Sequence, residues 1–358
     1  MKILKHILPA CLLCCGVAAA LTACSSDDDL TGYVPTAPTI EIQENNLTFP
    51  AQGSTATLSV GTNVSVELNA SWCTATVNGS VVTVTAEPNA SFEGRTALLT
   101  LTAGDARRQL PVQQLGMVLG TMPVSSRSVS MAGEAFTYNI PHDLPMTVTA
   151  TESWLHADLD GERLTITADA NNEGHLRRGL IITESTGYRD TLSLVQYDLH
   201  QDVVGSYYIL GYYGSNAEQP AATRFDVVER NDSLFMHFSS DTGRYDDTYI
   251  YVPFNSETCT LTFLSAFTLY QKGNTADTGY FYDTNNYICT SRFAGVNCTL
   301  YYSGATGVNV GQLSTYNWPG HTIDGFIIRS VSIVTSTLIQ LSHIVITRVG
   351  PVGTSLSN

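Results

Sequence analysis

A repeat with a period of 82 residues constrains this chain more than any other feature of its sequence. Ser71-Trp72 recurs as Ser153-Trp154, and without a gap 13 of the 44 residues from 71 to 114 are identical to those from 153 to 196. Two copies of one small domain explain this match better than chance. The matched positions include a glycine, an asparagine, an arginine and a closing glutamine, at Gly79/Gly161, Asn89/Asn171, Arg95/Arg177 and Gln114/Gln196.

Each copy of the repeat has the pattern of short β-strands. Residues 55–60 and 81–84 alternate apolar and polar side chains, and Asn78-Gly79 between strand-like runs marks a hairpin turn. About seven such strands with frequent turns predict an immunoglobulin-like sandwich. We therefore predict an all-β chain that begins with two tandem immunoglobulin-like β-sandwiches, over residues 47–117 and 118–198.

The repeated residues resemble those of BACON domains, which are small sandwich modules of Bacteroidetes surface proteins. The likeness rests on the Ser-Trp pair, the loop asparagine, the arginine and the last strand ending in glutamine, and it covers roughly residues 40–198. It implies two roles, a spacer between a lipid anchor and a functional domain and a carbohydrate-binding module. We expect Trp72 and Trp154 to fill the sandwich cores rather than to contact a ligand.

The N-terminus has the pattern of an exported lipoprotein. Residues 1–23 combine two lysines, an apolar run and a small-residue cleavage site, which is typical of a signal peptide. Leu21-Thr22-Ala23-Cys24 resembles a bacterial lipobox, which implies that Cys24 carries acyl chains such as palmitate and anchors the chain in the lipid of the cell outer membrane. The acidic run 25–29 resembles the export tag of Bacteroidetes-type lipoproteins and implies that the chain faces the exterior. We interpret residues 24–46 as the lipidated cysteine followed by a polar tether.

The charge balance excludes one class of partner. The chain carries 17 basic and 32 acidic residues, a net charge of −15. Such a chain repels phosphate backbones, so we expect no nucleic acid to bind.

Residues 199–358 differ in composition from the repeats. Fourteen of the 18 tyrosines and nine of the 12 phenylalanines lie beyond residue 200, and strand-like runs continue to the end. They predict an antiparallel β-barrel or sandwich. Gly205-Ser206-Tyr207 and the last strand before Arg348 resemble lipocalin-like barrels, which implies a cup that holds a ligand.

Four cysteines remain after the signal peptide and Cys24. Cys289 and Cys298 bracket a plausible hairpin, so the export of the chain makes them a candidate disulfide. Two free thiols on short strands are an equally good interpretation. We expect no metal site and no cofactor, because no cysteine or histidine spacing matches one.

The acidic motifs of the chain match neither a catalytic site nor a complete calcium loop. Asp241-Thr242-Gly243 and Asp277-Thr278-Gly279 lack the flanking residues of an aspartic peptidase, and we interpret both as turns. The run 169–174 matches half of a calcium loop, but Leu180 stands where the closing acidic residue belongs. Without a nucleophile, base or metal set, we expect no enzymatic activity.

Aromatic residues beside Asn, Gly and Pro in the last region are the remaining candidates for function. We predict that this surface binds a polysaccharide or host glycan without catalysis, since sugar rings stack on exposed aromatic rings. Tyrosines that only cap the end of a barrel are the alternative interpretation of these residues. Proteins of a glycan-uptake system are further candidate partners. The alternative function is that of a structural or adhesion lipoprotein that binds a protein. The candidate residues are Tyr212, Tyr213, Tyr280, Tyr282, Tyr287, Tyr316 and Trp318.

Overall fold

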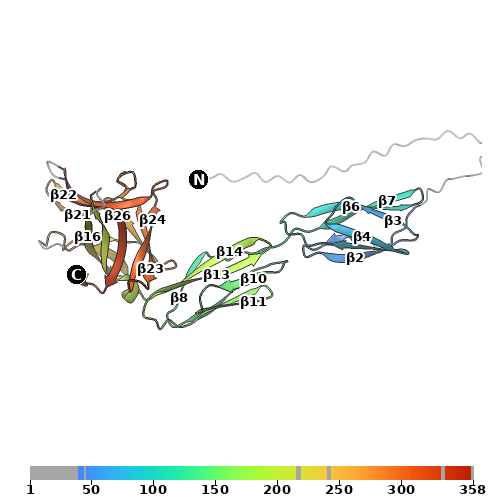
Figure 1. Cartoon of the computed structure of the whole chain (residues 1–358), viewed down its shortest axis with the longest axis horizontal. Helices are drawn as coiled ribbons and strands as arrows, with labels where there is room; N and C mark the ends of the chain where they lie inside the picture. Colours follow the sequence, from blue (N-terminus) through green and yellow to red (C-terminus); the bar gives the residue numbers. More distant parts are fainter. Residues whose placement is uncertain (1–38, 44–45, 215–218, 240–242, 332–334, 356–358) are drawn as a thin grey trace, which may run out of the picture.

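Two β-sandwiches and a β-barrel follow one another in a row (Figure 1). The computed structural model describes residues 39–43, 46–214, 219–239, 243–331 and 335–355. The predicted signal peptide, Cys24 and most of the predicted tether lie outside these residues. Within them, no helix is long and apolar enough to cross a membrane.

The first sandwich packs a four-stranded sheet on a three-stranded one, and both bury the alternate side chains of their strands. Ile40 and Ile42 already pack against its core, so the end of the predicted tether belongs to this sandwich. The turn at Gly79 has φ +61°, a conformation that glycine adopts without strain. The sheets have the orders β1-β7-β6-β3 and β2-β5-β4, with β1 (Thr48–Phe49), β2 (Ser54–Ser59), β3 (Ser65–Leu68), β4 (Cys73–Asn78), β5 (Val81–Ala86), β6 (Arg95–Ala103) and β7 (Ala106–Gln114).

The second sandwich repeats this arrangement strand for strand, which confirms the predicted pair of tandem immunoglobulin-like sandwiches. In both sandwiches the first strand of the larger sheet runs parallel to the last one. The sheets have the orders β8-β14-β13-β10 and β9-β12-β11, with β8 (Ser126–Val129), β9 (Glu134–Asn139), β10 (Thr147–Ala150), β11 (Leu155–Asp160), β12 (Arg163–Ala168), β13 (Arg177–Ser185) and β14 (Tyr188–Gln196).

The repeated arginine and glutamine hold the same position in each sandwich. Arg95 Nε donates to Gln114 Oε1 at 2.8 Å, and its guanidinium lies 4.6 Å from the centre of the Trp72 ring. Arg177 bonds to Gln196 at the same distance, and lies 4.4 Å from the ring of Trp154. The repeated residues therefore stabilise the fold.

The barrel is built on the long strand β26 (Thr335–Gly350), which pairs with three strands. One order runs β18-β17-β16-β15-β26-β24-β23-β20-β19, and β21, β22 and β25 extend from β26 as a further layer. The other strands are β15 (Gly205–Tyr213), β16 (Pro220–Arg230), β17 (Ser233–His237), β18 (Tyr249–Tyr251), β19 (Phe254–Asn255), β20 (Thr260–Leu264), β21 (Phe267–Lys272), β22 (Thr275–Asp283), β23 (Gly295–Ser303), β24 (Val308–Tyr316) and β25 (Ile323–Val331).

The segment between β18 and β19 joins the two edges of the long sheet, because its first residue pairs with one edge and the next residue with the other. Val252 N donates to Leu234 O next to β18, and Thr262 N donates to Pro253 O next to β19, both at 2.8 Å. Because these residues follow one another, the chain from β18 to β19 connects β17 to β20.

The barrel differs from the expected lipocalin-like one. β20 pairs with β23 rather than with β21, so the strands do not follow the simple up-and-down order of lipocalins. The prediction of a cup that holds a ligand is wrong, because buried side chains fill the interior of the barrel in the described residues. The largest of them are Tyr207, Phe225, Phe263, Phe281 and Phe326.

The second sandwich has a hydrophobic core of its own and also contributes residues to the core of the barrel. Leu176 and Val195 of the sandwich are buried together with the barrel residues. A short π-helix, η1 (Leu199–Val203), connects the two bodies, and Asp198 caps it by accepting hydrogen bonds from the backbone of His200 and Gln201.

Candidate functional site

The predicted tyrosines do not form one site. Tyr282 is only 2% exposed and donates a 2.6 Å hydrogen bond to Leu341 O, so its predicted contact with a glycan is wrong. Burial raises the pKa of its hydroxyl. Tyr280, two residues earlier on β22, is half-buried. Tyr212 and Tyr213 lie at the exposed end of β15, where Tyr212 and His343 border a separate hollow of about 540 Å³.

The candidate disulfide is also wrong, because Cys289 and Cys298 are both free and buried. Cys298 lies on β23 and points into the barrel toward Gly311, where a side chain would collide with its sulfur. Cys289 lies outside that strand pair, and its N–H donates to Phe281 O at 2.8 Å. Burial raises the pKa of the Cys298 thiol.

Two other predicted residues, Tyr287 and Trp318, meet at a histidine. Trp318 stacks on His321 with ring centres 4.3 Å apart, and Tyr287 approaches the same imidazole edge-on at 6.3 Å. Asn317 donates to the backbone carbonyl of Phe293 at 3.0 Å, so the loop that carries this ring, which is 81% exposed, lies next to the loop of Trp318. We define Tyr287, Phe293, Trp318 and His321 as the aromatic rim of the barrel.

A buried carboxylate fixes the aromatic rim. His321 Nδ1 lies 2.6 Å from Asp283 Oδ2, and Asp283 is only 1% exposed. The other carboxylate oxygen accepts the backbone N–H groups of Asn285 and Tyr287, each at 2.8 Å. Burial by itself would raise the pKa of Asp283, but the hydrogen bonds from His321, Tyr287 and Asn285 hold it below its ordinary value. One carboxylate therefore holds both the imidazole of His321 and the backbone that carries Tyr287.

Tyr316 lies apart from the rim contacts and lines an interdomain groove of about 610 Å³. One wall is the outer face of β20, β23 and β24, and the other is the edge of the second sandwich. Arg178 of that sandwich donates to Thr258 O at 2.6 Å and to Leu300 O at 2.8 Å, and its guanidinium lies 4.5 Å from the Tyr301 ring centre. Burial lowers the pKa of Arg178.

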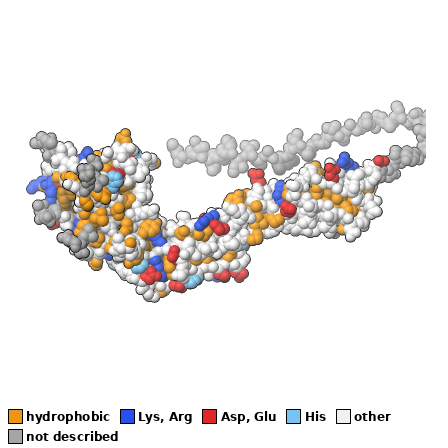
Figure 2. Space-filling model, viewed as in Figure 1, with side chains coloured by type: hydrophobic (Ala, Val, Ile, Leu, Met, Phe, Trp, Pro, Cys, Tyr) orange, Lys and Arg blue, Asp and Glu red, His pale blue; other side chains and the backbone are white. Residues whose placement is uncertain are grey.

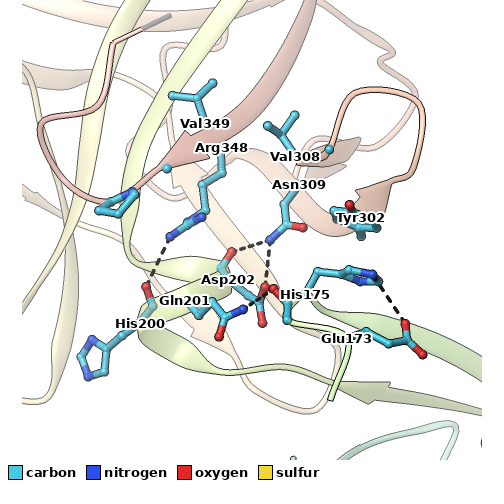
Figure 3. Close-up of a pocket in the computed structure, with 14 residues that line it drawn as sticks. Glu173, His175, His200, Gln201, Asp202, Tyr302, Val308, Asn309, Arg348 and Val349 are labelled. Atoms are coloured by element: carbon cyan, nitrogen blue, oxygen red, sulfur yellow. Dashed lines mark hydrogen bonds and ion pairs between the residues drawn. The ribbon is translucent and has the colours of Figure 1, made fainter. Parts of the chain in front are cut away.

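A smaller pocket of about 400 Å³ lies on the junction itself (Figure 3). Asp202 is buried there and accepts the N–H of Leu176 at 3.0 Å, while Asn309 donates to Asp202 O at 2.9 Å. Arg348 reaches the carbonyls of Val204 and His200 from the barrel side. These polar groups are already paired with one another, so they connect the sandwich to the barrel.

Asp277, in the second Asp-Thr-Gly motif, belongs to a structural ion pair and not to a turn. It lies inside β22, fully buried, and accepts hydrogen bonds from Arg244 at 2.6 and 2.9 Å. Asp241 of the first motif lies outside the described residues. Among the described residues, no three His, Cys, Asp or Glu side chains cluster as a metal site would require.

Sequence reasoning missed several residues of these sites. His321 follows Trp318 by three residues across Pro319-Gly320, a turn signal that could have suggested their contact. Asn297, Thr299 and Tyr301 alternate along β23, and this period of two could have identified the polar face of the groove. No signal in the sequence pointed to Arg178 or to the contact of Asp283 with His321, because these partners lie far along the chain.

Comparison with known proteins identifies one part of the chain. Residues 62–115 match the BACON family, whose description reads "Putative binding domain, N-terminal". The first sandwich therefore contains a BACON-like domain. No curated protein sequence matches the chain.

Among solved structures, the chain is similar to tandem domains of titin and to a glycoside hydrolase. An I9–I11 tandem from titin is 8% identical with a TM-score of 0.32, over 84% of this chain and 97% of that one. An endo-fucoidan hydrolase from glycoside hydrolase family 107 is 10% identical with a TM-score of 0.25, over 46% of this chain. This chain spans only 29% of the length of that hydrolase. Because both TM-scores are low, we draw no conclusion about function from them.

Proposed function

We propose that this protein is a surface-exposed lipoprotein that binds an extracellular glycan at the aromatic rim without catalysis. Acylated Cys24 would anchor it in the outer membrane, and the two sandwiches, both taken as BACON-like, would act as a spacer and as further carbohydrate-binding modules. The match of residues 62–115 to a family of binding domains is consistent with this proposal.

The observation that carries the proposal is the fixed geometry of the rim. Exposure of aromatic rings to water is energetically unfavourable, and exposed rings that cluster usually serve recognition. Tyr287 is 65% exposed, yet its backbone N–H is bonded to buried Asp283. A loop with a fixed backbone loses little conformational entropy on binding, so its exposed ring is suited to stacking on the flat C–H face of a sugar.

Affinity electrophoresis of the full chain in gels that contain a panel of polysaccharides tests this function. We expect retarded migration in at least one gel, and we expect Trp318→Ala to reduce the retardation. Tyr251→Ala is the matched control, because this exposed tyrosine of the barrel lies outside the rim and the groove. Unchanged migration in every gel would contradict the proposal.

Adhesion to a protein partner is the second candidate function. Phe293 favours it, since this ring is the most exposed large apolar side chain of the described residues and has no polar atom for a sugar hydroxyl. Loss of cell adhesion in Phe293→Ser, together with unchanged migration in the polysaccharide gels, would favour this function over the first.

A further inference from the structure

The interdomain groove has the chemistry of a site for an extended ligand. Its barrel wall is the outer face of three paired strands, and the register places matching polar residues side by side. Thr260 lies opposite Thr299 and Thr262 opposite Asn297, and Asn297 in turn lies opposite Ser314. Hydroxyl and amide groups therefore form rows across the sheet.

These rows are already organised by hydrogen bonds. Thr262 donates to Asn297 Oδ1, and the hydroxyls of Thr260 and Thr299 share a hydrogen bond, each at 2.9 Å. The Thr260 hydroxyl is buried and also bonded to Thr258, so the hydrogen-bonding groups that face the groove belong to the half-buried Asn297 and Thr299. Ser314, at the end of one row, is exposed.

A tyrosine stands at each end of the polar face. Tyr316 lies opposite Gly295, six residues from Tyr301 along β23. Six residues of an antiparallel strand span about 20 Å, which is long enough for several sugar units. Arg178 packs on Tyr301 and closes the junction end of the groove.

The groove lacks acidic side chains although the chain carries 32 of them. Among its described lining residues, Arg178 is the only charged one, and it is bonded to backbone carbonyls. A site of hydroxyls and amides between two aromatic rings, with no free charge, matches an uncharged ligand rich in hydroxyl groups.

The groove also leads toward the aromatic rim. Tyr316 directly precedes Asn317 and Trp318, and Asn317 connects them to Phe293. We infer that the interdomain groove binds a linear, uncharged glycan along its length and passes the end of that chain to the rim. This inference rests on the proposed function, since it takes the rim as the first contact with the same ligand.

The length of the ligand tests the inference. Calorimetric titration of the full chain with two-unit and six-unit cello-, xylo-, manno- and malto-oligosaccharides should show about tenfold tighter binding of the longer member of one series. Tyr301→Ala and Tyr316→Ala should each remove most of this gain and leave the affinity for the two-unit ligand unchanged. Tyr301→Phe should retain it, because the ring still stacks and still contacts Arg178.

The groove and the rim can fail separately in this experiment. Equal affinities for both lengths, or full affinity in both tyrosine-to-alanine variants, would overturn the groove inference and leave the proposed function intact. Absence of binding to every oligosaccharide and to the parent polymers would overturn both. Hexagalacturonate, which is long but charged, should bind more weakly than the neutral hexamer. Tighter binding of hexagalacturonate would contradict the inference that the groove selects an uncharged glycan.

Discussion

His321 Nδ1 lies 2.6 Å from the carboxylate of Asp283, and this pair sets the position of the aromatic rim. Asp283 ends β22, whereas His321 precedes β25, so the contact connects two loops that are 38 residues apart. Trp318 stacks on the imidazole of His321, with ring centres 4.3 Å apart. We therefore expect any change in the Asp283–His321 pair to affect the Trp318 ring, which we assign to glycan binding.

Asp283→Asn should weaken glycan binding by about tenfold, because the amide cannot provide a charge-assisted acceptor for both His321 and the loop N–H groups. Affinity electrophoresis measures the effect. Asp324→Asn on β25 is the matched control, since Asp324 faces His343 at 3.9 Å and not the rim. Equal loss of binding in the two variants would contradict the role of Asp283.

The hydrogen bond between Asp283 and His321 should persist until the pH is acidic. The pKa of Asp283 is held below its ordinary value, so its stabilising effect is complete above the unfolded pKa of about 3.9 and is lost as the pH falls through the lower folded pKa. Both neutral and protonated imidazole can carry the Nδ1 proton. The Nδ1 proton resonance should remain observable in NMR spectra from pH 7 to about pH 5, and its loss within that range would contradict the prediction.

The glutamines that close the two repeats should be equally important for stability. Gln114 and Gln196 are buried and each accepts a hydrogen bond from an arginine, so Gln114→Ala and Gln196→Ala should each lower the free energy of unfolding of their sandwich by about 1–3 kcal/mol. Chemical denaturation measures it, with exposed Gln113→Ala as the control. Changes as small as that of the control would show that the repeated residues do not stabilise the fold.

Asp202→Ala should loosen the junction between the second sandwich and the barrel. It removes the acceptor of Leu176 N inside the core of the barrel, so we expect faster proteolysis at residues 198–204 and a loss of about 1–3 kcal/mol in the free energy of unfolding. Asp247→Ala, at an exposed aspartate, is the control. If both variants resist protease like the unmodified chain, Asp202 does not hold the junction.

The sandwiches could be predicted from the sequence because their signals are local. Asn78-Gly79 marks a turn, and the recurrence of Arg95 and Gln114 as Arg177 and Gln196 pointed to a shared structure. The barrel was harder, because the pairing of β20 with β23 depends on strands about 35 residues apart. Tyr282 shows how a surface prediction fails, since three consecutive residues of β22 are buried and the alternation of faces ends there. Gly325 provides the space that its ring occupies.

Calorimetric titration of the full chain and of Trp318→Ala with the neutral six-unit oligosaccharides tests most directly whether the aromatic rim binds a glycan. We expect one series to bind the unmodified chain and Trp318→Ala to weaken this binding by about tenfold, while the control Tyr251→Ala leaves it unchanged. Binding that is identical in all three proteins, or absent from all of them, would contradict the assignment of the aromatic rim to glycan recognition.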